Sequence, residues 1–181
     1  VDLNATGTTA GAEGIDGGTI TADSSVFLNA NSISIGSIDT GGSLSANASG
    51  GNVAIEEANA RSGIGIFAQG NITGSYAGGA DIYLSAGGDI IASASAIGEG
   101  SSSSGTPTAA GLYVDADGDV VLTNSEASGM FGVNAGGSVT LNGGTAGEDM
   151  LVLAGTTADL SSITVGDDLN IRAPGAITVA G

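Results

Sequence analysis

The chain contains no cysteine, histidine, tryptophan or lysine, and its two basic residues are Arg61 and Arg172. Without cysteine there are no disulfides, thiolate nucleophiles or thiolate metal ligands. Without histidine and lysine, the commonest groups for proton transfer and nucleophilic catalysis are missing. We therefore expect that the protein is not an enzyme. The formal net charge is −17, and because this charge repels phosphate groups, nucleic acid is not expected as a partner.

Aromatic residues and long apolar runs are also scarce. The longest apolar run, residues 150–154, is far too short to cross a membrane, so we expect no membrane insertion. Aromatic residues make up 3% of the chain and hydrophobic residues 41%. A core must therefore be built from isoleucine, valine, leucine and alanine.

What the sequence does contain is a repeat with a period of about 19 residues. In each copy, apolar residues alternate with small polar ones, a turn with glycine follows, and the alternation resumes, as in residues 82–90, 112–120 and 131–139. The steps between copies are 17 to 21 residues, with a single step of 30, when measured between the first apolar residues after each turn: Ile15, Ile33, Val53, Ile72, Ile90, Val120, Val139, Leu160 and Ile177.

This period predicts an all-β fold, a single-stranded parallel β-helix of about nine coils. Nineteen residues are too few for a βαβ unit, so each copy must be one coil that stacks on the next. The step of 30 indicates one loop insertion, which we place at residues 98–107. We expect one solenoid domain over residues 1–181, forming a segment of a longer chain. Two inward columns follow: Ile64, Ile82, Leu112, Phe131, Leu151 and Leu169, and Ile66, Leu84, Val114, Val133, Leu153 and Ile171.

The turns carry a family resemblance. With Ala-Gly-Gly-Asp-Ile at 86–90 and Ala-Gly-Gly-Ser-Val at 135–139, the chain resembles the repeat region of filamentous-haemagglutinin-type exoproteins over nearly its whole length. The resemblance implies a right-handed β-helical shaft that a Gram-negative bacterium exports by two-partner secretion. It also implies an extracellular or cell-surface location and a role in adhesion or cell contact.

Carboxylates in the turns are candidate metal ligands. Asp89, Asp117 and Asp119 lie in turns of successive coils, and Asp115, Asp117, Asp119 and Glu126 follow the spacing of a calcium loop, although Val120 stands where that loop needs glycine. The repeat itself accounts for most of these residues as an ordinary turn. The same holds for residues 143–151, which resemble one imperfect calcium-binding nonapeptide and which we interpret as a Gly-rich corner. No cofactor is expected, and calcium is kept as an alternative.

The like charges of Asp89 and Asp119 suggest three outcomes. The pKa of one carboxyl is raised, a divalent cation bridges the pair, or both side chains are solvated and screened.

Two coils differ from the others on their outer surface. Their outward positions hold Tyr83 and Tyr113 before the turn and Ile91 and Val121 after it, where neighbouring coils have glycine, serine or threonine. These four residues predict an apolar stripe. Either the insertion at 98–107 covers the stripe, or the stripe binds a glycan or a protein receptor.

The sequence favours a structural or adhesive segment of a secreted bacterial exoprotein, whose partners are the neighbouring coils of a longer chain. The first alternative is a self-assembling extracellular filament or matrix subunit, because uncapped coils could join copies end to end. A carbohydrate-active β-helix enzyme is the least favoured alternative.

Overall fold

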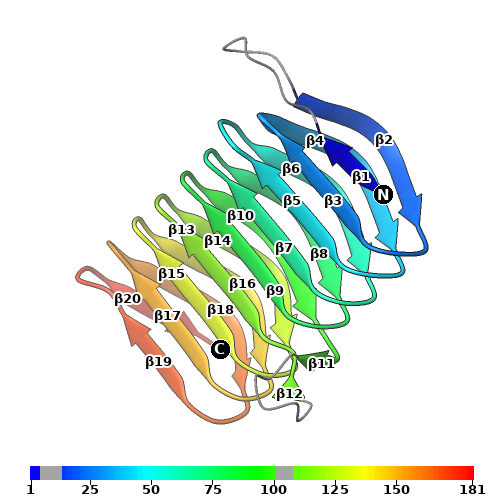
Figure 1. The fold of residues 1–181 in the computed structure, drawn as a ribbon. Coiled ribbons are helices and arrows are strands. Elements are labelled where there is room, and N and C mark those ends of the chain that lie inside the picture. The colour runs from blue at the N-terminus through cyan, green and yellow to red at the C-terminus, as the bar shows by residue number, and fades with distance from the viewer. Residues whose placement is uncertain (5–13, 101–107) are drawn as a thin grey trace.

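The computed structural model describes residues 1–4, 14–100 and 108–181. These residues form a β-solenoid of parallel strands with about eight turns and about 19 residues per turn, and they contain no helix (Figure 1). The predicted parallel β-helix is therefore confirmed. Within the described ranges, no helix is long and apolar enough to span a membrane.

Two parallel sheets of nine strands each run the length of the stack. The odd sheet contains, in spatial order, β1 (Asp2–Asn4), β3 (Val26–Ala30), β5 (Leu44–Ala48), β7 (Ile64–Ala68), β9 (Ile82–Ala86), β13 (Leu112–Ala116), β15 (Phe131–Ala135), β17 (Met150–Ala154) and β19 (Leu169–Arg172). The even sheet contains β2 (Gly14–Ala22), β4 (Ser32–Thr40), β6 (Val53–Ala60), β8 (Ile72–Gly78), β10 (Ile90–Ala96), β14 (Val120–Ala127), β16 (Val139–Ala146), β18 (Ala158–Val165) and β20 (Ile177–Ala180).

The longer strands of the even sheet bend near their middle. In β14 the in-and-out alternation breaks at Thr123 and Asn124, which are both exposed, and resumes at the buried Ser125. Asn124 has a φ of 48° and Gly74, in β8, a φ of 143°. These irregularities re-aim the second half of the strand toward the core. One strand of the even sheet therefore covers two sides of the solenoid.

The core is a set of apolar columns that run along the axis. Inward residues of one strand pair with inward residues of the next, as in Ile82, Leu112 and Phe131, and all three are almost fully buried. Within the described part of the chain, every buried side-chain nitrogen and oxygen atom has a hydrogen-bond partner. Burial of these columns is the main favourable contribution to folding.

The predicted columns are wrong in β17. Phe131 pairs with Met150 and Val133 pairs with Val152, so Leu151 and Leu153 point outward. All five residues of β17 are apolar, and such a run carries no alternation from which its facing could be predicted. The following strand is shifted as well, because its first inward residue is Ala158, which pairs with Val139, rather than Leu160.

The long coil lies where the two series predicted it. Tyr83 pairs with Tyr113 across 30 residues, whereas Tyr113 pairs with Gly132 across 19. The additional chain includes β11 (Glu99–Gly100) and β12 (Thr108–Ala109), which pair with each other antiparallel, apart from the two main sheets. The rest of the loop predicted at 98–107, residues 101–107, lies outside the described residues.

Candidate functional site

Two tyrosines stack on the outer face of the odd sheet. Tyr83 on β9 and Tyr113 on β13 occupy paired positions, and their ring centroids are 4.9 Å apart with an angle of 13° between the planes. The Tyr113 ring also covers Gly111, where an added Cβ atom would lie 2.5 Å from its Cε2 atom. Parallel pairing in register thus brings together two residues that are 30 positions apart in the sequence.

Acidic groups surround this stack. Partial burial raises the pKa of both tyrosines, and the negative charge of Asp81 raises both further. Glu148 contributes in the same direction to the pKa of Tyr113. Asp81 also accepts a hydrogen bond from the backbone N–H of Gly111, 2.8 Å from its Oδ1 atom. The stack is therefore an apolar surface in a negative environment.

Ile91 and Val121 form a separate patch. They pair with each other on β10 and β14 of the even sheet, and Ile91 is 54% exposed. The tyrosines lie on the odd sheet, on the far side of the turn that joins β9 to β10. The structure therefore divides the predicted stripe into two patches of two residues each. The insertion that was one candidate to cover them lies mostly outside the described residues.

The turn after each odd strand carries a ladder of side-chain hydrogen bonds. The backbone N–H of Asp89 donates to Oδ1 of Asn71 (2.8 Å), that of Asp119 to Oδ1 of Asp89 (2.9 Å), and that of Ser138 to Oδ1 of Asp119 (2.7 Å). Each side chain thus binds the backbone of the following coil. The predicted stacking of Asp89 on Asp119 is confirmed.

The predicted rise in pKa is contradicted at Asp119. The backbone N–H of Ser138 and then its hydroxyl, 2.9 Å from Oδ1, hold the pKa of Asp119 below the ordinary aspartate value of 3.8. Hydrogen bonds to the charged carboxylate favour its ionised form. Their effect exceeds the like-charge effect on which the prediction was based.

The structure brings together a different set of carboxylates from the predicted one. Oxygen atoms of Asp149, Asp167 and Asp168 lie within 4.8 Å of one another, the one such group of three among the described residues. These residues lie in the turns that precede β17 and β19. Asp149 and Asp168 are one period of 19 residues apart, so the repeat could have revealed them. Calcium binding by Asp89, Asp117 and Asp119 stays a prediction.

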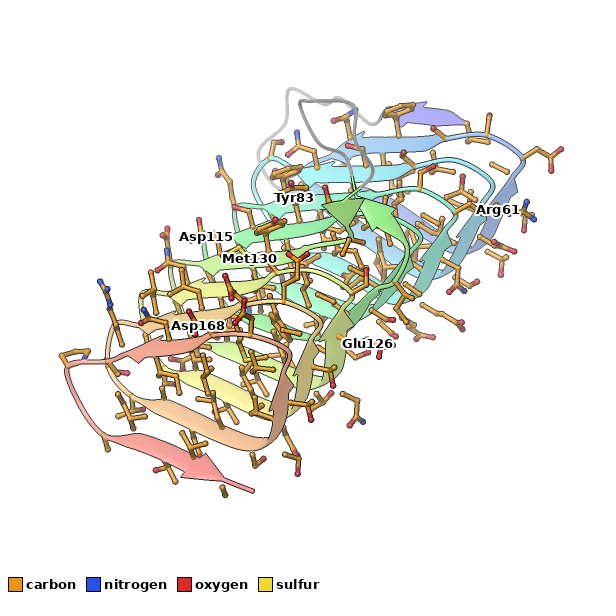
Figure 2. The ribbon with its side chains drawn as sticks, turned by 90° about the horizontal axis from the view of Figure 1, so that it is seen from below. Arg61, Tyr83, Asp115, Glu126, Met130 and Asp168 are labelled. Carbon is orange, nitrogen blue, oxygen red and sulfur yellow. The ribbon has the colours of Figure 1, made fainter. Side chains whose placement is uncertain are left out.

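The residues of the calcium-loop pattern do not form a loop. Asp115 lies on β13 of the odd sheet, whereas Glu126 lies on β14 of the even sheet, where its Oε1 atom accepts a hydrogen bond from the Ser95 hydroxyl. Figure 2 shows Asp115, Tyr83 and Met130 on one side of the molecule and Glu126 on the other. The alternative interpretation as an ordinary turn therefore agrees with the structure.

Comparison of the chain with known proteins finds no matching family model, no matching curated protein and no matching solved structure.

Proposed function

We propose that this chain is a structural and adhesive segment of a secreted, cell-surface bacterial exoprotein, where it acts as a shaft that mediates contact with other cells. The observation that carries the proposal is the continuity of the two nine-stranded parallel sheets along one axis. With neighbouring strands about 4.8 Å apart, the stack is a rod about 40 Å long. Such a rod holds outward side chains at fixed distances from a surface.

The chemistry of the chain supports a contact role over catalysis. The sequence has no histidine, lysine or cysteine, and Arg61 and Arg172 lie on different coils, on β6's following turn and on β19. The outer face instead offers aromatic residues, with Tyr83, Phe27 and Phe67 each about half exposed. Tyrosine and phenylalanine are enriched where proteins meet their partners.

The test is an adhesion assay with the purified chain. Beads coated with the protein should attach to cells, and beads coated with an acidic globular protein of matched charge should not. Electron microscopy of the same sample should show short rods of uniform length. Equal attachment of the two kinds of bead would overturn the adhesive role.

Self-assembly into a filament is a second candidate. Leu169, Ile177 and Val179 in the last coil are 42%, 46% and 55% exposed, although the equivalent residues of earlier coils are buried. β19 and β20 also have an edge with no further strand in the described structure, and such edges can pair with another chain. Rods that lengthen with protein concentration would favour this candidate.

A further inference from the structure

The outer face of the odd sheet contains a gap beside Tyr113. In one outward column, Tyr83, Tyr113, Gly132 and Leu151 follow one another on neighbouring strands. A Cβ atom added at Gly132 would meet no side chain closer than Cδ1 of Tyr113, at 3.6 Å. Tyr83 covers one face of the Tyr113 ring, so the other face borders the side-chain position that Gly132 leaves empty.

The gap has room for one flat group. Two strand spacings separate Tyr113 from Leu151, roughly 9.6 Å along the axis. A planar group in contact with carbon atoms on both of its faces needs about 7 to 8 Å. The groove that contains the gap encloses about 310 Å³, and its lining includes Met130, Asp115 and Asn134.

The charge around the gap is negative on both sides of the ring. Asp115, exposed on β13, accepts a hydrogen bond from the side-chain amide of Asn134 (2.6 Å). Asp81 and Glu148 act electrostatically on the Tyr113 hydroxyl. Arg172, the arginine in the column of Asn134, lies two strands further on, beyond Leu153. An aromatic face among carboxylates attracts a cation.

We propose that this gap binds an arginine side chain of a basic partner protein, with the guanidinium stacked on Tyr113 and its N–H groups directed to Asp115. The proposal names the partner chemistry of the contact role and rests on the proposed function. A guanidinium is planar, is weakly hydrated and can pair with a carboxylate through two hydrogen bonds, whereas a lysine ammonium is compact and strongly hydrated. The flat gap therefore selects arginine over lysine.

Tyrosine fluorescence provides a direct readout, because the chain has three tyrosines and no tryptophan, and Tyr76 is buried. The probes are a hexa-arginine peptide and a hexa-lysine peptide at 150 mM salt, where long-range attraction to the acidic chain is screened. The arginine peptide should change the tyrosine emission and bind about threefold to tenfold more tightly than the lysine peptide.

Three variants locate the binding site. Gly132→Val fills the gap with two methyl groups and should weaken arginine-peptide binding about tenfold. Tyr113→Leu keeps the site apolar but removes the aromatic face, so it should abolish the preference for arginine. The control, Thr140→Val on the outer face of β16, makes a similar change on the even sheet and should leave the Kd unchanged. Melting curves confirm that each variant is folded.

Several results would overturn the proposal. Equal affinity for the two peptides, with no effect of Gly132→Val or Tyr113→Leu, would show that only diffuse charge attraction operates. A neutral oligosaccharide that binds the wild type but not Gly132→Val, without any arginine preference, would assign the gap to a glycan. If the peptides fail but coated beads still attach to cells, the arginine assignment is wrong and the adhesive role stands. If the beads fail to attach, the adhesive role is itself contradicted.

Discussion

The second glycine of each Gly-Gly-Asx turn has a steric reason that lies in the preceding coil. An added Cβ atom would lie 2.2 Å from Oδ1 of Asp89 at Gly118, and 2.2 Å from Oδ1 of Asp119 at Gly137. The side-chain oxygen that binds the backbone of the next coil thus occupies the space that a Cβ atom would need. Thr156, whose backbone N–H binds the Gly137 carbonyl, follows a coil that carries Ser138 in place of an Asx residue. Serine is shorter, and there a side chain fits.

This coupling between coils predicts non-additive mutations. Gly137→Thr should destabilise the wild type by about 1 to 3 kcal/mol, because the new side chain meets the Asp119 carboxylate. In the Asp119→Ser background the same substitution should cost less, with a coupling energy of about 0.5 to 3 kcal/mol. Urea unfolding of the wild type, the two single variants and the double variant measures this difference. Additive effects of the two substitutions would contradict the steric explanation.

The lowered pKa of Asp119 predicts a loss of stability in acid. Because its folded-state pKa lies below the ordinary value of 3.8, the ionised side chain stabilises the fold above that value. This contribution is lost as the pH falls from about 5 through the folded pKa. The advantage of the wild type over Asp119→Asn should therefore shrink as the pH falls.

Melting temperatures between pH 7 and pH 2 test this prediction. Asp159→Asn, which removes one exposed charge from the even sheet, is the control for the change in net charge. If the wild type and Asp119→Asn keep a constant difference in melting temperature at every pH, the Ser138 hydrogen bonds do not stabilise the ionised form.

At the scale of the element, a local irregularity lets the even strand β8 bury its largest side chain. Tyr76 is almost fully buried, and its hydroxyl donates to the backbone carbonyl of Thr73 (2.9 Å). Burial raises its pKa. Two residues earlier, Gly74 has a φ of 143°, and an added Cβ atom there would lie 1.7 Å from the carbonyl oxygen of Ile55. The strand accommodates Tyr76 by having no side chain at Gly74.

Gly74→Ala should therefore be strongly destabilising. The methyl group collides with the backbone of β6 and requires a strained backbone conformation, so we expect a loss on the order of 2 to 4 kcal/mol in the free energy of unfolding. Gly132→Ala is the matched control, because the space around Gly132 is open. Urea denaturation gives both values, and two variants of equal stability would contradict the prediction.

At the scale of the whole molecule, the chain is a long acidic stack with a formal charge of −17. Each coil contacts mainly its neighbours, so stability is approximately a sum of coil and interface contributions. Repulsion between carboxylates on successive coils opposes this stacking. Salt screens such repulsion over about 10 Å at 0.1 M.

Raising sodium chloride from 10 to 300 mM should therefore raise the melting temperature. Differential scanning calorimetry at pH 7 measures the shift, and the same series at pH 3, where most carboxyl groups are protonated, is the control that should show a smaller one. A melting temperature that falls with salt at pH 7 would show that favourable ion pairs outweigh repulsion.

The sequence by itself determined the period, the strand class and the position of the long coil. Repeat spacing survives in the sequence because each coil must place an apolar residue above an apolar residue. It also predicted correctly that Tyr83 stacks with Tyr113 and Asp89 with Asp119, because residues one period apart meet in a parallel stack. The jump of 30 was visible for the same reason.

The tertiary structure alone decided facing and hydrogen bonding. The apolar run in β17 allowed either facing of Leu151 and Leu153, and the choice was made by pairing with β15. The bend in the even strands and the turn after β9 set Ile91 and Val121 apart from the tyrosines. The pKa of Asp119 depended on the Ser138 N–H and hydroxyl, whose positions no one-dimensional pattern contains. Periodicity records which residues are neighbours, whereas the direction of a side chain depends on the register and curvature of the backbone that carries it.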